Sequence, residues 1–291
     1  QSAAAEVGVA EDLETRALLS AVSFDAANGI LTLEADAGEV NHVGVNGPAH
    51  NLSIQDSAGI EIAAGQEDLF LRVSANRVVL RNQDLQQVEL DLKDENDRVV
   101  AGGSRIPVNM DLGDGDDWVI SGSTVGDLIH GRDGDDKIFG YGGDDIIHGD
   151  DGDDRIFGSA GDDQLYGGKG DDYLNGANGD DELYGGAGHD ELAGSWGDDF
   201  LSGGDGSDSL WGDRGADRFE GGDGHDLFFA VFRGPNMDAS IDGGEGVDVL
   251  YTFDIDSVPS HLKVNVEHDI PDIFRLWDLT RRDLFRWTKL W

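Results

Sequence analysis

The sequence predicts an all-β protein whose central part is a right-handed parallel β-roll, or β-solenoid. Three observations predict this fold. A nine-residue unit repeats without a shift from Gly122 to Phe229, and each unit carries Asp at its sixth position and a large apolar residue at its eighth. Glycine, at 44 of 291 residues, is more than twice as frequent as in an ordinary protein. A short fixed period is typical of solenoids, in which each repeat stacks only on its neighbours.

One unit, GGKGDDYLN from Gly167 to Asn175, shows how nine residues form half a turn. Its first six positions are rich in Gly and Asp, which suit tight turns and positive φ, and its last three form a minimal strand. Strand side chains alternate between faces, so the apolar Leu174 is expected to point inward. Two units make a flattened turn of about 18 residues, and stacking at about 4.8 Å merges the eighth-position residues into one core. A disordered acidic linker would not keep an apolar residue at every ninth position.

The same period aligns the sixth-position aspartates, because units two apart lie on the same edge of the solenoid. Two columns result: Asp127, Asp145, Asp163, Asp181, Asp199 and Asp217 in one, and Asp136, Asp154, Asp172, Asp190, Asp208 and Asp226 in the other. Neighbouring carboxylates at this spacing repel unless they are protonated or bridged by a cation. Calcium fits because it takes six to eight oxygen ligands at about 2.3–2.6 Å, whereas magnesium demands rigid octahedral geometry and zinc or copper prefers other donors.

The pattern G-G-x-G-x-D-x-(large apolar)-x resembles the RTX, or hemolysin-type, calcium-binding repeat. The resemblance implies that calcium ions lie between loops of successive turns and that the repeats fold on meeting extracellular calcium after type I secretion. It extends to the sixth-position aspartates and to the glycines at positions one and four. It does not extend to Val125, which replaces the fourth-position glycine of the first unit, so the first loop is expected to be incomplete.

Two further aspartates match the motif next to insertions. Asp117 belongs to a unit that precedes the inserted Ser121, and Asp248 belongs to a unit that follows an insertion at Ala230–Asp242. We expect both to join the twelve column aspartates as calcium ligands. Ten same-edge pairs in the uninterrupted array predict about ten Ca²⁺ ions.

Charge and composition exclude several classes of function. The formal net charge is −41, from 61 acidic and 20 basic side chains, so the chain cannot bind nucleic acid through its phosphates. It has no cysteine for disulfides or thiolate metal sites, and no apolar run long enough to span a membrane. The segment from Gln1 to Ala10 has no charged start and apolar stretch, so a leader is either removed or replaced by another export route. We expect a secreted protein, extracellular or at the cell surface.

Four segments are expected along the chain. Residues 1–20 form a flexible start. Residues 21–111 form a β-rich cap, whose short alternating strands at Ile30, Asn51, Arg77 and Val88 could be degenerate solenoid turns. Residues 112–251 form the β-roll, and residues 252–291 form a capping segment with a short basic, aromatic helix after Pro271. Membrane or partner binding and a secretion signal are the alternative roles of that helix.

Ninth-position aromatic residues are predicted to stack in ladders on both faces. One face carries His130, His148, Tyr166 and Tyr184, and the other carries Phe139, Phe157, Trp211 and Phe229. Cross-strand packing is the favoured interpretation, and stacking on sugar rings is the alternative. The histidines that replace Asp at position five, His189 and His225, are interpreted as neutral variation.

We do not expect an enzyme, because no nucleophile elbow, zinc helix motif or phosphate loop is present. The predicted function is calcium binding by a structural or adhesive extracellular module. The alternative is an accessory module of a secreted enzyme or a polysaccharide-binding protein, with a polysaccharide or cell-surface component as its partner. A hidden active site would show as a polar cleft with convergent acids or with His42 and His50.

Overall fold

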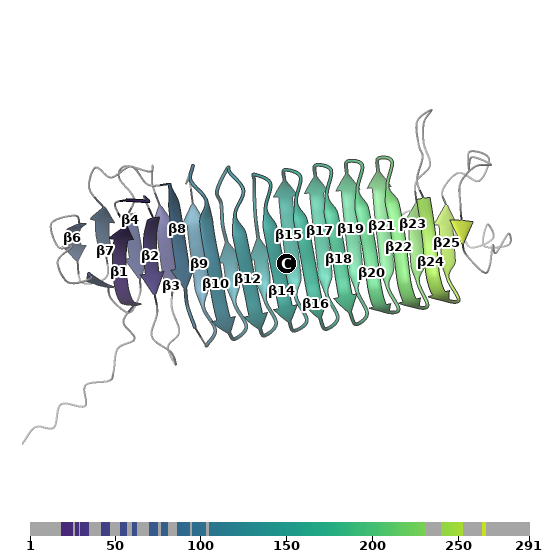
Figure 1. The fold of residues 1–291 in the computed structure, drawn as a ribbon, viewed down its shortest axis with the longest axis horizontal. Coiled ribbons are helices and arrows are strands. Elements are labelled where there is room, and N and C mark those ends of the chain that lie inside the picture. Colours follow the sequence, from purple (N-terminus) through teal and green to yellow (C-terminus); the bar gives the residue numbers. More distant parts are fainter. Residues whose placement is uncertain are drawn as a thin grey trace, which may run out of the picture.

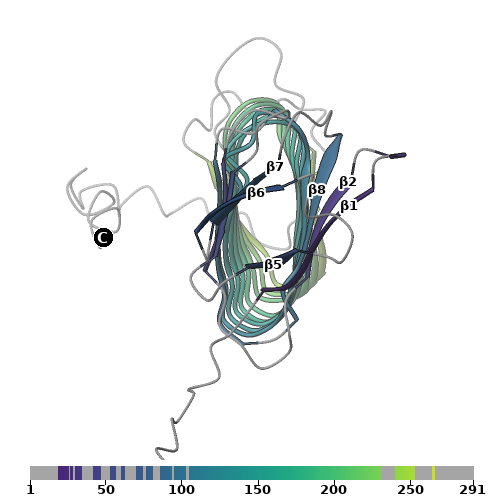
Figure 2. The same cartoon turned by 90° about the vertical axis from the view of Figure 1, so that its left-hand side faces the viewer.

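The computed structural model of the protein describes a subset of its residues. They are residues 19–25, 27–28, 30–34, 42–46, 53–56, 60–62, 70–74, 77–80, 86–93, 95–102, 105–230, 240–252 and 264–265. In this part of the chain every regular element is a β-strand, and the strands form two sheets of 13 strands each. The sheets face one another along an elongated, flattened tube, which confirms the predicted all-β solenoid (Figures 1 and 2).

The first sheet contains the even-numbered strands of the repeat region. In spatial order its strands are β26 (Val264–Asn265), β24 (Ser240–Gly246), β22 (Arg218–Gly224), β20 (Phe200–Gly206), β18 (Glu182–Ala187), β16 (Gln164–Lys169), β14 (Ile146–Asp151), β12 (Leu128–Asp133), β10 (Val108–Asp114), β8 (Gln87–Asp91), β2 (Ile30–Glu34), β1 (Leu19–Asp25) and β5 (Ile60–Ile62).

The second sheet contains the odd-numbered strands of the repeat region. In spatial order its strands are β25 (Val249–Thr252), β23 (Leu227–Ala230), β21 (Ser209–Arg214), β19 (Glu191–Trp196), β17 (Tyr173–Asn178), β15 (Arg155–Ala160), β13 (Lys137–Phe139), β11 (Trp118–Ile120), β9 (Arg98–Gly102), β3 (His42–Asn46), β4 (Ser53–Asp56), β7 (Arg77–Leu80) and β6 (Phe70–Ser74).

Within the array each strand pairs in parallel with the strand two units away. Leu165 of β16 lies opposite Leu183 of β18, and Ile156 of β15 lies opposite Leu174 of β17, a register of two nine-residue units. This register places every eighth-position side chain from Ile129 to Phe228 in one file between the sheets, at 0–1% exposure. Parallel strands covered on one face by a second sheet bury that face completely, so these side chains are the hydrophobic core.

The strands before the array continue both sheets of the solenoid. β8 and β2 extend the first sheet in parallel, and β9 and β3 extend the second. Pairing becomes antiparallel only farther out, between β1 and β2 and among β3, β4, β7 and β6. The strands predicted at Ile30, Asn51, Arg77 and Val88 correspond to β2, β4, β7 and β8. Both sheets therefore cross the expected boundary at residue 111 without a break.

Backbone geometry assigns a different role to each glycine of the unit. Fourth-position glycines such as Gly170 have positive φ (125°), as predicted for the turn. Position two also has positive φ, even where the residue is not glycine, as in Ala177 (81°). First-position glycines after Gly122 do not have positive φ. Glycine is needed there because an added Cβ would lie too close to neighbouring atoms. Consequently the glycine at position two of many units relieves strain, and the glycine at position one makes space.

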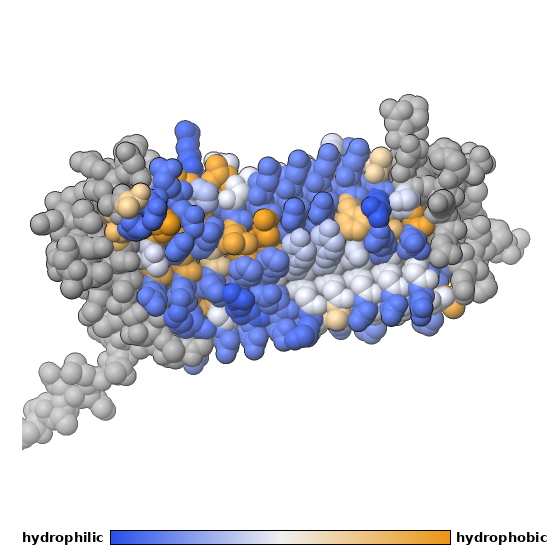
Figure 3. All heavy atoms as spheres, viewed as in Figure 1, coloured by the Kyte–Doolittle hydropathy of each residue, from blue (hydrophilic) through white to orange (hydrophobic). Residues whose placement is uncertain are grey.

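The face of the described residues that Figure 3 shows is largely hydrophilic, with a few hydrophobic side chains among the hydrophilic ones. Tyr141, Ile146, Trp196 and Val247 are the exposed large hydrophobic residues of this part of the chain. Among the described residues, no helix has the length and apolar character needed to cross a membrane. The helix predicted after Pro271 and residues 1–18 of the flexible start predicted for residues 1–20 lie outside the described residues. Residues 19 and 20 begin β1.

Candidate metal centre

The sixth-position aspartates are held by their neighbours in the adjacent turns. The backbone N–H of Asp154 donates to Oδ1 of Asp172 at 2.8 Å, and the backbone N–H of Asp172 donates to Oδ1 of Asp190 at 2.9 Å. Each carboxylate therefore has one oxygen committed to the preceding turn. The side chain is nearly inaccessible to solvent, with 2% exposure at Asp172.

These hydrogen bonds arrange the aspartates in the two predicted columns. Asp117 and Asp248, whose partners the sequence leaves open, extend the column of Asp136: the N–H of Asp117 donates to Asp136 Oδ1, and the N–H of Asp226 donates to Asp248 Oδ1. In the other column Asp127 follows Val108, whose N–H donates to Asp127 Oδ1. All fourteen predicted aspartates are buried and lie along the turn edges of the solenoid.

The sequence interpretation missed one member of a column, Asp97. Its side chain is 3% exposed, and its backbone N–H donates to Oδ1 of Asp117 at 2.6 Å. The signal is weak because neither glycine of the unit is retained before it. The spacing from Asp97 to the buried Val99 nevertheless matches that between positions six and eight, and Lys93 and Glu95 adopt the positive φ of positions two and four. Residues 92–100 thus form a degenerate repeat unit.

The second carboxylate oxygen of most column aspartates has no hydrogen-bond partner within the described residues. This holds for Oδ2 of Asp117, Asp136, Asp145, Asp154, Asp163, Asp172, Asp181, Asp190, Asp199, Asp208 and Asp226. A buried charged oxygen without a partner is costly, and the protein responds by favouring its neutral form. Burial raises the pKa of Asp172 and Asp199 to about 8 and that of Asp181 to about 6, although a backbone hydrogen bond lowers each value.

Except at Asp117, whose unit begins with Leu112, each unpartnered oxygen lies beside the first-position glycine of its own unit. A Cβ at Gly167 would lie 2.3 Å from Oδ2 of Asp172 and 2.6 Å from the carbonyl oxygen of Gly185 in the next turn. A carboxylate oxygen and a main-chain carbonyl oxygen thus converge where only glycine leaves room. Such all-oxygen sets, made of carboxylates and turn carbonyls, are the ligands that calcium prefers.

The first loop of the array differs from the regular units. Here the hydroxyl of Ser121 donates to Oδ2 of Asp127, so this aspartate is not among those with an unpartnered oxygen. Ser123 accepts from the backbone N–H of Val125 and tightens the local turn. The inserted Ser121 therefore satisfies internally the oxygen that the regular units leave available.

The aspartates at position five have a separate role that the sequence interpretation missed. The N–H of Asp171 donates to Oδ1 of Asp153 in the preceding turn at 2.8 Å, opposite in direction to the bonds of position six. An Asp-Asp pair therefore ties its turn to both neighbours. His189 keeps this role because its Nδ1 accepts from the N–H of Ser207 at 2.9 Å. His225 does the same for Val247, so both histidines keep the hydrogen bond of the aspartates that they replace.

The predicted aromatic ladders are present on both faces. His130 stacks on His148 with ring centroids 4.6 Å apart, and the ladder continues through Tyr166 to Tyr184. On the other face the stacked pairs are Phe139 with Phe157 and Trp211 with Phe229. The parallel register places identical positions one above another, so cross-strand stacking follows directly from the nine-residue period.

Comparison with known families agrees with this geometry. The family model of the RTX calcium-binding nonapeptide repeat matches four stretches, residues 121–156, 148–183, 157–192 and 193–228. Residues 121–228 are an RTX repeat array. A search of curated proteins found no match to the chain.

The buried columns fit the ion for which the RTX repeat is named. Calcium needs negatively charged oxygen ligands, and unpartnered carboxylate oxygens recur from turn to turn beside main-chain carbonyls. An ion bound there would supply positive charge between carboxylates that otherwise repel one another. The column aspartates would hold it from the turns, while the RTX core between the sheets keeps the two columns apart.

Proposed function

We propose that the sixth-position aspartates bind calcium between successive turns, and that this binding drives the folding of a structural or adhesive extracellular module. The observation that carries the proposal is the repeated buried Oδ2 atom without a hydrogen-bond partner, as at Asp172 and Asp190. Such an oxygen in turn after turn along both edges is expected where ions bind. Without an ion, each buried oxygen that lacks a partner would destabilise the fold.

Calcium binding and folding are coupled because the ligands meet only in the stacked turns. Asp154 and Asp172 are two repeat units apart in the sequence and become neighbours through the register of β15 and β17. The net charge of −41 produces repulsion that favours the expanded, unfolded chain. Without an ion, only a thin hydrophobic core favours the folded state against this repulsion. Metal binding free energy then becomes folding free energy.

An extracellular location follows from this coupling as part of the proposal. Affinities of extracellular calcium modules lie at about 10⁻⁴–10⁻³ M, so such a chain would be unfolded at intracellular calcium and folded outside the cell. The role we propose is structural and not catalytic. A polysaccharide or cell-surface component remains the candidate partner, and the stacked Tyr166 and Tyr184 on one face are the observation that favours sugar contact.

The binding step can be tested by counting ions. Equilibrium dialysis of the full chain against calcium, with magnesium at the same ionic strength as the control, should give about ten bound Ca²⁺ ions and a cooperative isotherm. Magnesium should neither bind in that number nor displace calcium at equal concentration. Binding of one or two ions without cooperativity would contradict the proposal that the columns are the sites.

A further inference from the structure

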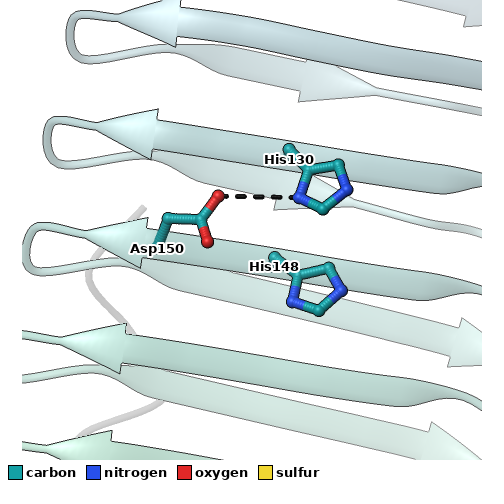
Figure 4. A group of neighbouring side chains, drawn as sticks. All are labelled: His130, His148 and Asp150. Carbon is teal, nitrogen blue, oxygen red and sulfur yellow. Dashed lines mark ion pairs between the residues drawn. The ribbon is translucent and has the colours of Figure 1, made fainter.

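A second kind of metal site is suggested by three side chains on the outer face of the first sheet. His130 lies in β12, and His148 and Asp150 lie in the adjacent β14, where the parallel register sets His130 opposite His148. The two imidazole rings are nearly parallel, with an interplanar angle of 7°. One ligand atom from each of the three side chains lies within 4.8 Å of the other two, and the rings turn a nitrogen toward the Asp150 carboxylate (Figure 4).

Two atoms of this group face each other without forming a hydrogen bond. Nδ1 of His130 and Oδ2 of Asp150 are 3.6 Å apart, which is too far for a hydrogen bond. Both atoms are shielded from solvent, and neither has a hydrogen-bond partner among the residues that the structure describes. A nitrogen and a carboxylate oxygen that lack a hydrogen bond at this separation would both be satisfied by one cation between them.

The backbone at Asp150 has the left-handed conformation that position two adopts in most units, as it does at Ser159 and Ala177. Asp150 occupies position two, where many units have glycine, and its φ is 78°. Asp150 therefore adds a carboxylate at a position where many other units have glycine.

The charges around the group permit a cation. Arg132 lies near Asp150, with NH1 3.9 Å from Oδ2, but its guanidinium makes two hydrogen bonds to Asp111, at 2.8 and 2.7 Å. One positively charged arginine thus lies beside two negatively charged carboxylates, so the local charge is negative.

We propose that His130, His148 and Asp150 bind one Zn²⁺ ion that joins two successive turns. Two imidazoles and a carboxylate are typical zinc ligands and leave a fourth position for water, whereas calcium and magnesium prefer oxygen ligands alone. Zinc–ligand distances of about 2.0–2.2 Å place ligand atoms about 3.5 Å apart, close to the observed separation of His130 from Asp150. The site is distinct from the aspartate columns, which lie at the turn edges.

The position of this site suggests its role. β12 directly follows the irregular loop in which Ser121 satisfies Asp127. A calcium ion that bridges regular turns would find one fewer available oxygen there. A zinc ion between β12 and β14 would stabilise the stacking of these two turns next to the irregular loop.

The test uses two variants that move toward the repeat pattern and should therefore fold. His148→Tyr extends the Tyr166–Tyr184 ladder by one turn, and Asp150→Gly restores the glycine found at position two of other units. The full chain, held in saturating calcium so that the columns are occupied, is titrated with Zn²⁺ by calorimetry. The unmodified chain should bind one Zn²⁺ per molecule at this site, and each variant should bind it at least tenfold more weakly.

The matched control is His189→Asn, which removes a histidine whose Nδ1 accepts a backbone hydrogen bond that Asn can also accept. It should leave zinc binding unchanged. Circular dichroism of the same samples reports calcium-dependent folding separately, so failure of the calcium proposal and failure of the zinc proposal are distinguishable. Equal zinc affinity in both variants and the parent, or no zinc binding in saturating calcium, would overturn the proposal.

A second measurement needs no variant. Diethyl pyrocarbonate modifies imidazoles that are not metal-bound, and peptide mass mapping locates the modified histidines. Zn²⁺ added to the calcium-loaded chain should protect His130 and His148 and leave His189 reactive. Equal protection of all three histidines, or of none, would contradict the site.

Discussion

The backbone N–H of Asp154 donates a hydrogen bond to Oδ1 of Asp172, 2.8 Å away in the next turn, while Oδ2 of Asp172 remains buried and without a partner among the described residues. One carboxylate thus supports the backbone with one oxygen and leaves the other available. The same relationship recurs along both edges. Each turn therefore repeats both the hydrogen bond that holds the backbone and the carboxylate oxygen that is available to an ion.

Replacing Asp172 by Asn should have opposite effects with and without calcium. Asp172→Asn keeps the shape of the side chain and removes one buried negative charge, so the metal-free fold should become more stable. The site loses charge, so the calcium concentration at half-folding should rise several-fold. Circular dichroism during calcium titration measures both effects.

The control for this variant is Asp171→Asn in the same unit. Asp171 is exposed, and its Oδ1 accepts from the backbone N–H of His189, a bond that Asn can also accept. The overall charge change is the same, and the calcium midpoint should move by less than twofold. Equal shifts in the two variants would indicate that net charge, and not the buried oxygen, sets calcium affinity.

Gly167→Ala should destabilise the calcium-bound fold by about 1–3 kcal/mol, the range for overpacking. The added methyl group would overlap Oδ2 of Asp172 and the carbonyl oxygen of Gly185, although φ at this position is not positive. Gly142→Ala is the matched control, because its Cβ would meet its nearest neighbour at 3.6 Å. Urea unfolding at fixed calcium measures the difference, and similar midpoints for both variants would refute the crowding argument.

Acidification should stabilise the metal-free fold. In the folded state burial raises the pKa of column aspartates to about 6 for Asp181 and about 8 for Asp172, above the ordinary value of 3.8. At any pH between 3.8 and the raised pKa of an aspartate, the folded state therefore binds more protons than the unfolded state. Its free energy of unfolding should rise as pH falls through 8 and 6, by about 1.4 kcal/mol per pH unit for each extra proton.

Circular dichroism of the chain in chelator between pH 8 and pH 5 tests this pH dependence, and the range stays above the pI of about 4.1. The β signal should grow toward pH 5. In calcium the dependence should reverse, because protons compete with the ion for the carboxylates, and calcium binding near pH 7 should release protons. A metal-free chain that is better folded at pH 8 than at pH 5 would contradict the raised pKa values.

Removing one core side chain should raise the calcium requirement. Leu174 is fully buried between the sheets, so Leu174→Ala should cost about 2–5 kcal/mol of stability. Val247→Ala, at an exposed position, should change stability by less than about 0.5 kcal/mol. Denaturant unfolding at fixed calcium gives both values, and an equally small effect at Leu174 would mean that ions alone hold the turns together.

The sequence predicts the array well because period and geometry coincide there. A nine-residue unit with one inward residue fixes the register, so Leu174 and Leu183 could be placed in the core and Asp154 and Asp172 in one column. The same logic placed His130 over His148. Each of these placements depends only on counting residues and on the alternation of strand side chains.

What the sequence did not predict depends on three-dimensional contacts. Asp97 joins a column although its unit has lost the glycines, because Lys93 and Glu95 adopt the left-handed conformation without them. The role of His189 is apparent only when its Nδ1 is seen to accept a backbone bond from Ser207. The hydrogen bond from Ser121 to Asp127 likewise could not be predicted, because a periodic pattern does not specify where an inserted residue lies.

Whether calcium completes this fold can be measured by far-ultraviolet circular dichroism of the full chain during calcium titration. At neutral pH we expect a coil-like spectrum in chelator, a cooperative change to a β spectrum with calcium, and no such change with magnesium at equal concentration. A complete β spectrum in chelator, unchanged by calcium, would show that the buried carboxylate columns are stable without an ion and would refute calcium-driven folding.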